Sequence, residues 1–191
     1  MVKRTLLFVL MIPLLFFTAC IGDESGERFD AFRAATAAAA VSATAEVRAD
    51  YGETVYDFTL RCTGGGDEYT VEVLSPERLA GIRAHLAQGG SRLEYEDIIL
   101  DTGDLTSDGL TPVSALPTIL RAIAEGHVER LWEADGYLAA EIYLGDADTL
   151  TLWLDGDNCP AAAEIVSGGT MVLSCRFTHW QTDLQRNEAP G

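Results

Sequence analysis

The chain has 191 residues, of which 30 are acidic and 13 are basic, giving a formal net charge of −17 at neutral pH. Such a surface repels phosphate backbones and anionic lipid headgroups, which argues against a nucleic-acid-binding protein and against electrostatic adhesion to a membrane. The acidic residues are dispersed along the chain, so they also fit an ordinary solvated surface.

The first twenty residues predict an export signal. Residues 3–4 are basic, residues 6–17 are apolar, and a Thr-Ala pair precedes Cys20. This composition is typical of a secretory signal peptide, and the apolar run is shorter than the roughly 20 residues of a membrane-spanning helix. The ending resembles the lipobox of bacterial lipoproteins, in which the cysteine is acylated and becomes the first residue, although Phe17 stands where leucine is usual. We therefore expect Cys20 to be the lipidation site. The alternative is an ordinary signal peptide that is cut nearby and leaves Cys20 a plain thiol.

Removal of the signal leaves about 170 residues, enough for one domain with a sizeable core. The remaining 11 basic residues face 30 acidic ones, a net charge of −19. We expect a signal peptide at 1–20, a tether at 21–26, one domain at 27–183 and a flexible tail at 184–191. A tether of about six residues spans at most roughly 20 Å, so the domain is expected close to the extracytoplasmic face of the cell membrane.

The first half of the domain predicts one helix followed by strands. Residues 27–39 place Phe29 and Phe32 on one helical face, with Ser25 as a candidate N-cap. From residue 41 the apolar period becomes two, which is typical of half-buried strands. Strands are predicted at 41–49, 56–62 and 69–73, as an antiparallel meander, and, after a short turn, at 82–86. A further strand is predicted from 93 to 100, with residues 98–100 buried on both sides or bulged, and a loop at 101–110.

The second half predicts another helix and five strands. The helix covers 114–125, with Ser114 as its cap and Pro117 in its first turn. One apolar stripe follows the helical spacing i, i+3, i+4 and i+7, and its members are Leu116, Ile119, Leu120 and Ile123. The strands are predicted at 127–134, 137–144, 149–154, 161–166 and 170–180.

This order of elements predicts an α+β fold. About ten antiparallel strands must twist and curl, and two apolar helices need a face to cover. We expect a strongly curved sheet, a half-barrel, with both helices on its concave side. The four stripe residues of the second helix would then either plug the core or face a ligand.

Three stretches carry a resemblance to a known family: 75–81 (SPERLAG), 93–95 (LEY) and 110–117 (LTPVSALP). They are similar to small Gram-positive lipoproteins of the LolA/LolB-like lipoprotein carrier superfamily. A germination lipoprotein that activates a spore-cortex amidase is a relative of the same kind. The resemblance would cover 27–180 and implies a half-barrel with an internal helical plug, but it brings no catalytic residues.

Three cysteines follow Cys20. Cys62 and Cys175 are each in phase with apolar neighbours and are expected to point inward, whereas Cys159, before Pro160, is expected to be exposed. An extracytoplasmic location permits a disulfide, but three thiols cannot all pair within one chain, so the pairing stays open. The spacings contain no C-x-x-C, so no zinc site is expected.

The polar residues form no catalytic set. The three histidines, His85, His127 and His179, lie on separate predicted elements, without an acidic or thiol partner at ligand or triad spacing. Residues 155–158 superficially resemble a calcium loop, but Val166 stands at the twelfth position, where a glutamate is required. We therefore predict no metal, no cofactor and no enzymatic activity.

Two functional hypotheses remain. In the first, which the resemblance favours, the half-barrel binds the acyl chains of a lipid or lipoprotein; Ala43, Ala45 and Ala49 would leave the hollow, or would simply let a helix approach. In the second, the core is filled, and the surface or a sheet edge holds or activates a protein of the cell envelope. Permanent anchoring argues against a carrier that shuttles.

Overall fold

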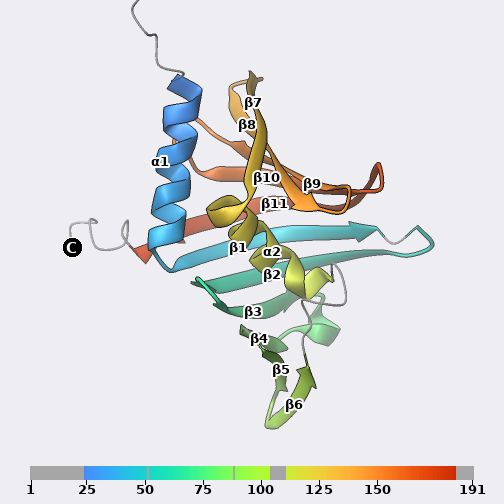
Figure 1. The fold of residues 1–191 in the computed structure, drawn as a ribbon. Helices are drawn as coiled ribbons and strands as arrows, with labels where there is room; N and C mark the ends of the chain where they lie inside the picture. Colours follow the sequence, from blue (N-terminus) through green and yellow to red (C-terminus); the bar gives the residue numbers. More distant parts are fainter. Residues whose placement is uncertain (1–23, 51, 88, 104–110, 184–191) are drawn as a thin grey trace, which may run out of the picture.

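The structure, a computed structural model, describes residues 24–50, 52–87, 89–103 and 111–183. These residues form two α-helices and one open antiparallel sheet of eleven strands, which curves around the helices (Figure 1). The predicted α+β half-barrel is confirmed. Cys20, the predicted signal peptide and the predicted tail lie outside the described residues. Within those residues, no helix has the length and apolar character needed to cross a membrane.

The elements are α1 (Glu24–Ala38), β1 (Val41–Asp50), β2 (Val55–Gly65), β3 (Glu68–Ser75), η2 (Glu77–Leu79), β4 (Arg83–Ala87), β5 (Gly90–Tyr95), β6 (Ile98–Gly103), α2 (Pro112–Glu125), β7 (His127–Ala134), β8 (Tyr137–Gly145), β9 (Asp148–Leu154), β10 (Pro160–Ser167) and β11 (Thr170–Thr182). The sheet order is β6-β5-β4-β3-β2-β1-β11-β10-β9-β8-β7. Two meanders, one from each half of the chain, therefore join where the first strand pairs with the last.

Strand β1 shows why the sheet has one buried face. Along β1 the odd-numbered residues are buried, and the even-numbered residues between them are half-buried or exposed. Ala45 therefore points to the concave side of the sheet, and Glu46 points to the convex side. The register carries the same face across the join, because Ala45 lies opposite Leu60 on β2 and Phe177 on β11. The concave face is therefore continuous over both halves.

Helix α2 lies in this hollow (Figure 1). The four members of its apolar stripe are at most 2 % exposed: Leu116, Ile119, Leu120 and Ile123. Full burial of one such side chain contributes about 1.5–3 kcal/mol relative to exposure. The stripe is therefore a main source of the free energy that holds α2 against the sheet.

Helix α2 begins earlier than predicted. Thr111 is the N-cap: its side chain accepts the Ser114 N–H at 3.1 Å, while Ser114 Oγ accepts the Thr111 N–H at 2.9 Å. Ser114 thus belongs to a capping box and is not itself the cap. The prediction that Pro117 lies in the first turn is also wrong. Pro117 stands further inside the helix, where its ring deprives the Val113 carbonyl of an intrahelical donor.

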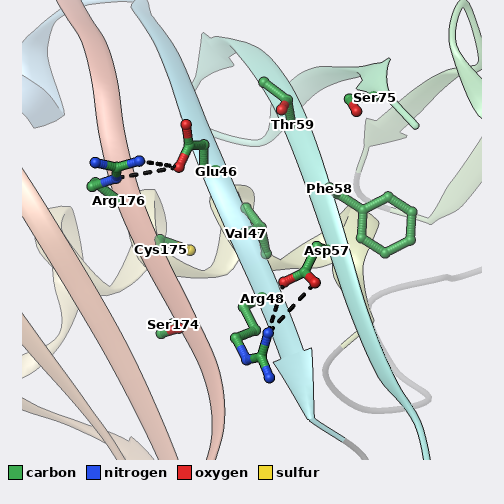
Figure 2. Close-up of a pocket in the computed structure, with 10 residues that line it drawn as sticks. All are labelled: Glu46, Val47, Arg48, Asp57, Phe58, Thr59, Ser75, Ser174, Cys175 and Arg176. Atoms are coloured by element: carbon green, nitrogen blue, oxygen red, sulfur yellow. Dashed lines mark hydrogen bonds and ion pairs between the residues drawn. The ribbon is translucent and has the colours of Figure 1, made fainter. Parts of the chain in front are cut away.

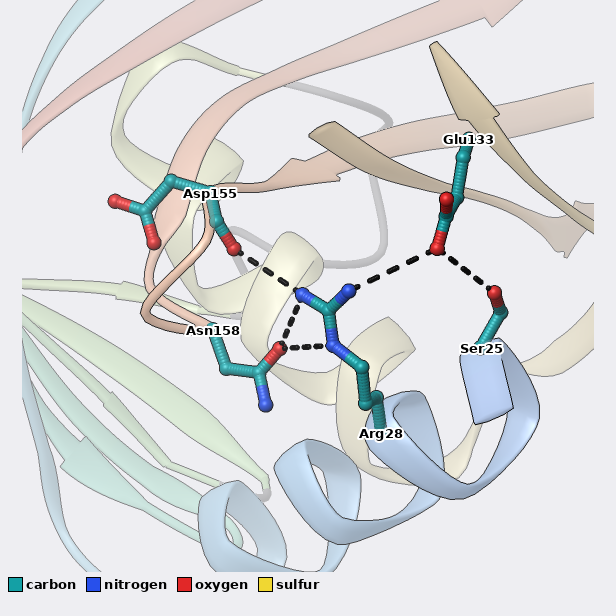
Figure 3. Close-up of polar contacts among 5 residues, drawn as sticks. All are labelled: Ser25, Arg28, Glu133, Asp155 and Asn158. Carbon is teal, nitrogen blue, oxygen red and sulfur yellow. Dashed lines mark hydrogen bonds and ion pairs between the residues drawn. The ribbon is translucent and has the colours of Figure 1, made fainter. Parts of the chain in front are cut away.

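Helix α1 also begins before the predicted start, at Glu24, so the assignment of Ser25 as N-cap is wrong. Ser25 Oγ instead donates to Glu133 on β7 at 3.1 Å. Arg28 donates from Nη2 to Asn158 Oδ1 at 2.9 Å and to the Asp155 carbonyl at 3.4 Å (Figure 3). These contacts attach α1 to the β7 end of the sheet and to the β9–β10 turn.

The strand predicted at 93–100 is wrong. The chain reverses at Glu96, whose φ is 53°, and forms two strands, β5 and β6, so the sheet has eleven strands rather than about ten. Residues 98–100 are neither buried on both sides nor bulged; they are exposed. The reason is topological, because β6 ends the sheet and, among the described strands, has a neighbour on one side only. Residues 101–103, predicted as loop, belong to β6, and residues 104–110 lie outside the described part.

Candidate functional site

The concave face is filled by α2. Ala43 and Ala45 on β1 have no exposed surface, because the helix packs over them. Within the described residues, one void between α1, α2 and the sheet has a volume of about 70 Å³ and is lined in part by Thr36, Tyr69 and Leu120. Sites for small molecules usually measure about 300–1,000 Å³. The alanines of β1 therefore let the helix approach the sheet rather than leave a hollow for an acyl chain.

Helix α2 is fixed at its C-terminal end by Arg33 of α1. Arg33 Nε donates to the Ile123 carbonyl at 2.9 Å, and Nη2 donates to the Gly126 carbonyl at 3.0 Å and to the Ala124 carbonyl at 3.3 Å. These are the carbonyls that a helix end leaves without partners, and a cation there also complements the helix dipole. Together with the capping box at the N-terminus, Arg33 makes α2 a fixed plug.

Aromatic rings pack α1 against the last strand. The Phe32 and Trp180 ring centroids lie 5.8 Å apart, and Phe177 meets Trp180 edge-on at 5.7 Å. Phe29 continues the cluster, with its ring 6.2 Å from that of Phe32. This contact closes the concave face at the α1 side.

The convex face carries shallow grooves between cross-strand ion pairs. One, with a volume of about 510 Å³, runs beside Arg48, which lies 3.2 Å from Asp57, and beside Arg176, which pairs with Glu46 (Figure 2). The hydrogen bond and charge of Glu46 raise the pKa of Arg176. The four charged side chains that line this groove form two ion pairs and sum to zero, so the lining itself has no net charge with which to attract a charged ligand.

A second convex groove, of about 560 Å³, is lined in part by Tyr137, Trp153 and Arg176. Tyr137 and Trp153 were not predicted from the sequence to line a groove. The alternation of residues along β9 was the available signal, because it puts Trp153 on the outward face of the strand. In the structure Trp153 lies opposite Ala139 and Ala162 on the neighbouring strands and shares their face.

Three polar side chains line up on the convex face. Thr70 Oγ1 lies 3.2 Å from His85 Nδ1, and His85 Nε2 lies 3.1 Å from Glu94 Oε2. The prediction that no histidine has an acidic partner is therefore wrong for His85. Glu94 is on β5, so its distance along the chain hid a contact that the sheet creates.

Hydroxyl, imidazole and carboxylate in this order match the groups of a nucleophilic triad. The array nevertheless lies on the open face of the sheet, with His85 and Glu94 half-buried and in contact with water. Thr70 and His85 are direct cross-strand neighbours, so the register alone accounts for their contact. An adjacent ladder of the same kind, Arg61–Glu72–Arg83, spans 3.2 and 3.6 Å. We therefore interpret the array as sheet stabilisation.

The remaining polar candidates stay apart. His127 lies opposite Tyr143 on β8, and His179 lies opposite Thr44 on β1. In the part of the chain that the structure describes, no three His, Cys, Asp or Glu side chains are grouped closely enough to hold a metal ion. Residues 155–158 form a turn, in which Asp155 Oδ1 accepts the N–H groups of residues 157 and 159, each at 2.9 Å.

The three described cysteines are all free thiols. Cys62 and Cys175 are buried, and burial raises the pKa of each to about 12, although Arg121 partly opposes this at Cys62. Cys159 is half-buried rather than exposed. Burial is the main cause that raises its pKa, and the negative charges of Asp155 and Asp157 raise the pKa further. Since the thiolate is the reactive form, none of these thiols is activated at neutral pH.

One edge of the sheet is apolar and exposed, which was not predicted from the sequence. Tyr95 and residues 98–100 lie on the β5–β6 hairpin with large exposed surfaces. A turn at the acidic pair 96–97 was the signal that would have revealed it, since such a turn makes the following residues a separate edge strand.

Comparisons with known proteins give likenesses to solved structures at low sequence identity. No protein-family model matches the sequence, and a search of curated proteins finds no match. A conserved protein from Thermus thermophilus is similar in structure, with TM-score 0.48 and 10% identity over 87% of this chain and 95% of that one. A LolA superfamily protein from Nitrosomonas europaea gives TM-score 0.44 and 11% identity over 82% and 92% of the two chains.

A chain in the structure of the CwlD amidase from Clostridioides difficile in complex with the GerS lipoprotein gives TM-score 0.45 and 14% identity over 82% and 94%. At such low identities these likenesses concern the fold, and any function has to be argued from the residues of this chain. The fold itself, an open half-barrel with an N-terminal helix and an internal helical plug, is the one that the resemblance to the lipoprotein carrier superfamily implied.

Proposed function

We propose that this chain is a membrane-anchored, extracytoplasmic and non-catalytic binding protein whose ligand is another protein of the cell envelope. The observation that carries the proposal is the filled concave face. Four buried side chains of α2 occupy the space in which an acyl chain would lie, and the void beside them measures about 70 Å³. Because α2 fills the concave face in the described part of the chain, we expect binding on the outer surfaces and the edges of the sheet.

The way α2 is held supports the same proposal. Opening the hollow for a lipid would require α2 to leave the sheet. Leu120 and Ile123 would lose their burial, and the three carbonyl contacts of Arg33 would break. Loss of several such contacts costs more than the few kcal/mol that separate readily exchanging conformations. Binding of acyl chains, the first hypothesis from the sequence, is therefore the less favoured function.

The proposal is tested by measuring non-covalent lipid on the full chain. The protein is purified from host membranes in a non-ionic detergent and examined by native mass spectrometry and by organic extraction. We expect no stoichiometric lipid beyond a covalent anchor. The double variant Ile119→Ala/Leu120→Ala, which opens a cavity, serves as a positive control for lipid uptake. One acyl lipid per parent chain that survives washing would overturn the proposal in favour of lipid binding.

The anchor is a separate part of the proposal. Cys20 follows a basic head and an apolar run, and its acylation would hold the chain at the membrane. In membrane fractionation, the variant Cys20→Ser is expected to be lost from the processed, membrane-bound pool, whereas Cys159→Ser remains there. A Cys20→Ser chain that is processed and retained like the parent would contradict lipidation at this residue.

A further inference from the structure

The β6 edge, defined here as Tyr95 and Ile98–Gly103, carries the largest exposed apolar side chains of the described residues. Ile98, Ile99 and Leu100 are 59 %, 62 % and 58 % exposed, and Tyr95 is 42 % exposed. The β5–β6 hairpin projects from the end of the sheet, far from the start of α1 (Figure 1). Large apolar side chains gathered in this way on a soluble surface mark a site of interaction.

The opposite edge of the sheet, β7, is protected. Glu133 on β7 accepts from Ser25 of α1 and lies 3.8 Å from Arg28, so α1 is held against this edge. The β7–β8 register is also interrupted between Val128 and Arg130, which bends the edge. A covering helix, charges and a bulge are the usual devices that prevent strands from adding to an edge.

The β6 edge lacks those devices over its apolar run, since residues 98–100 are uncharged and keep a regular register with β5. Ile98 and Leu100 lie opposite Tyr95 and Leu93 and share their face of the sheet, whereas Ile99 lies on the other face. Among the described residues, no strand pairs with the outer side of β6. An added strand would pair with the backbone groups on that side and cover apolar side chains on both faces.

The charges around the run define the partner. Residues 90–103 contain one basic residue, Arg92, and four acidic ones, a net charge of −3. Asp97 precedes the apolar run and Asp101 follows it, so carboxylates flank it at both ends. A partner segment with an apolar centre and basic residues on either side is complementary to this pattern.

The same charges disfavour two other occupants. If a second copy paired antiparallel about Ile99, Asp97 of one copy would lie opposite Asp101 of the other, and like charges directly opposite are destabilising. An anionic membrane surface is repelled by the acidic hairpin.

We propose that the β6 edge binds an extended segment of a partner protein by strand addition, the segment having alternating apolar residues flanked by lysine or arginine. This inference rests on the proposed function, because it names the chemistry of the protein ligand. It locates binding at one edge and leaves the filled concave face uninvolved.

The test uses the full chain in non-ionic detergent and a fluorescent nine-residue peptide, alternating valine and threonine with two lysines at each end. A matched peptide has glutamates in place of the lysines. We expect the lysine peptide to bind at least about tenfold more tightly, because like charges oppose the other. Binding should slow hydrogen exchange in residues 98–103 and leave residues 127–134 unchanged.

The variant Ile99→Lys should weaken binding about tenfold or more, since it places a cation on the edge. Met171→Lys, at another exposed apolar side chain, is the matched control and should bind like the parent. Circular dichroism checks that both variants are folded. If a variant fails to fold, the hydrogen-exchange experiment on the parent chain still tests the inference.

Three results would overturn the inference. They are equal binding of the two peptides without protection of 98–103, a dimer of the chain that Ile99→Lys dissociates, and binding of the detergent-free Cys20→Ser chain to phosphatidylglycerol vesicles that protects 98–103 from hydrogen exchange. Each would leave the proposed function standing if the chain still carries no lipid. A lipid bound to the parent would instead refute the proposed function, whatever the peptides do.

Discussion

Cys62 and Cys175 lie on opposite sides of the same strand: Cys62 faces Ala43 of β1 from β2, and Cys175 faces Val47 of β1 from β11. Two strand spacings amount to about 9.6 Å, which already exceeds the roughly 7 Å that the Cα atoms of a disulfide can span. The shift along β1 adds to this separation. The two inward thiols therefore cannot form a disulfide with each other in this fold.

This arrangement predicts the order in which the thiols react. In a Cys20→Ser background, a thiol reagent at pH 8 should label Cys159 first, because Cys62 and Cys175 are buried and become accessible only when the structure opens. We expect one thiol per chain in the native protein and three in denaturant. Labelling of Cys159 no faster than the other two would contradict the assignment.

The buried thiols also predict a loss of stability at alkaline pH. Burial raises the pKa of Cys175 from 9.0 to about 12, so the unfolded chain ionises first as the pH rises. The stabilisation from the neutral buried thiol is complete below pH 9 and is lost between pH 9 and about pH 12. The slope is about 1.4 kcal/mol per pH unit for one thiol.

The measurement is urea unfolding at a series of pH values for the parent and for Cys175→Ala. The difference in unfolding free energy between the two chains should shrink above pH 9, because only the parent has this thiol to ionise. A difference that stays constant from pH 8 to pH 11 would show that Cys175 is not buried as described.

The burial of Leu120 between α2 and the sheet predicts that shortening this side chain strongly lowers the stability of the protein. Leu120→Ala should lower the free energy of unfolding by about 2–5 kcal/mol, because the removed atoms leave a cavity against the sheet. Leu79→Ala, at a position that is 39 % exposed, is the matched control and should cost much less. Denaturant titration measures both, and a loss below about 0.5 kcal/mol for Leu120→Ala would place α2 outside the hollow.

The contacts of Arg33 predict that its charged side chain stabilises the C-terminal end of α2. Arg33→Met keeps most of the aliphatic side chain but removes the donors to the carbonyls of residues 123, 124 and 126. We expect a loss of about 1.5–3 kcal/mol, typical of hydrogen bonds to a charged group. Arg48→Met breaks only an exposed ion pair with Asp57 and should cost about 1 kcal/mol or less. Equal losses for the two variants would contradict the role of Arg33.

Local patterns in the sequence were sufficient for most of the fold. The spacing of Leu116, Ile119, Leu120 and Ile123 predicted the buried face of α2. The period of two predicted β1, and turn residues delimited the five strands from β7 to β11. These predictions held because side-chain periodicity follows from backbone geometry within one element. The predicted helix starts were wrong because hydrophobic periodicity does not mark a cap. The Thr111 cap is a side-chain contact outside the apolar stripe.

Only the tertiary structure decided which elements meet. The pairing of β1 with β11 joins strands from the two ends of the domain, and no local pattern specifies such a long-range contact. The same applies to Glu94, which reaches His85 only through the order of the strands, and to Arg33, whose partners are on another helix. Residues 98–100 read as buried because they are apolar, yet they are exposed because β6 ends the sheet. Hydrophobicity is a property of the residue, whereas burial depends on what the rest of the chain places beside it.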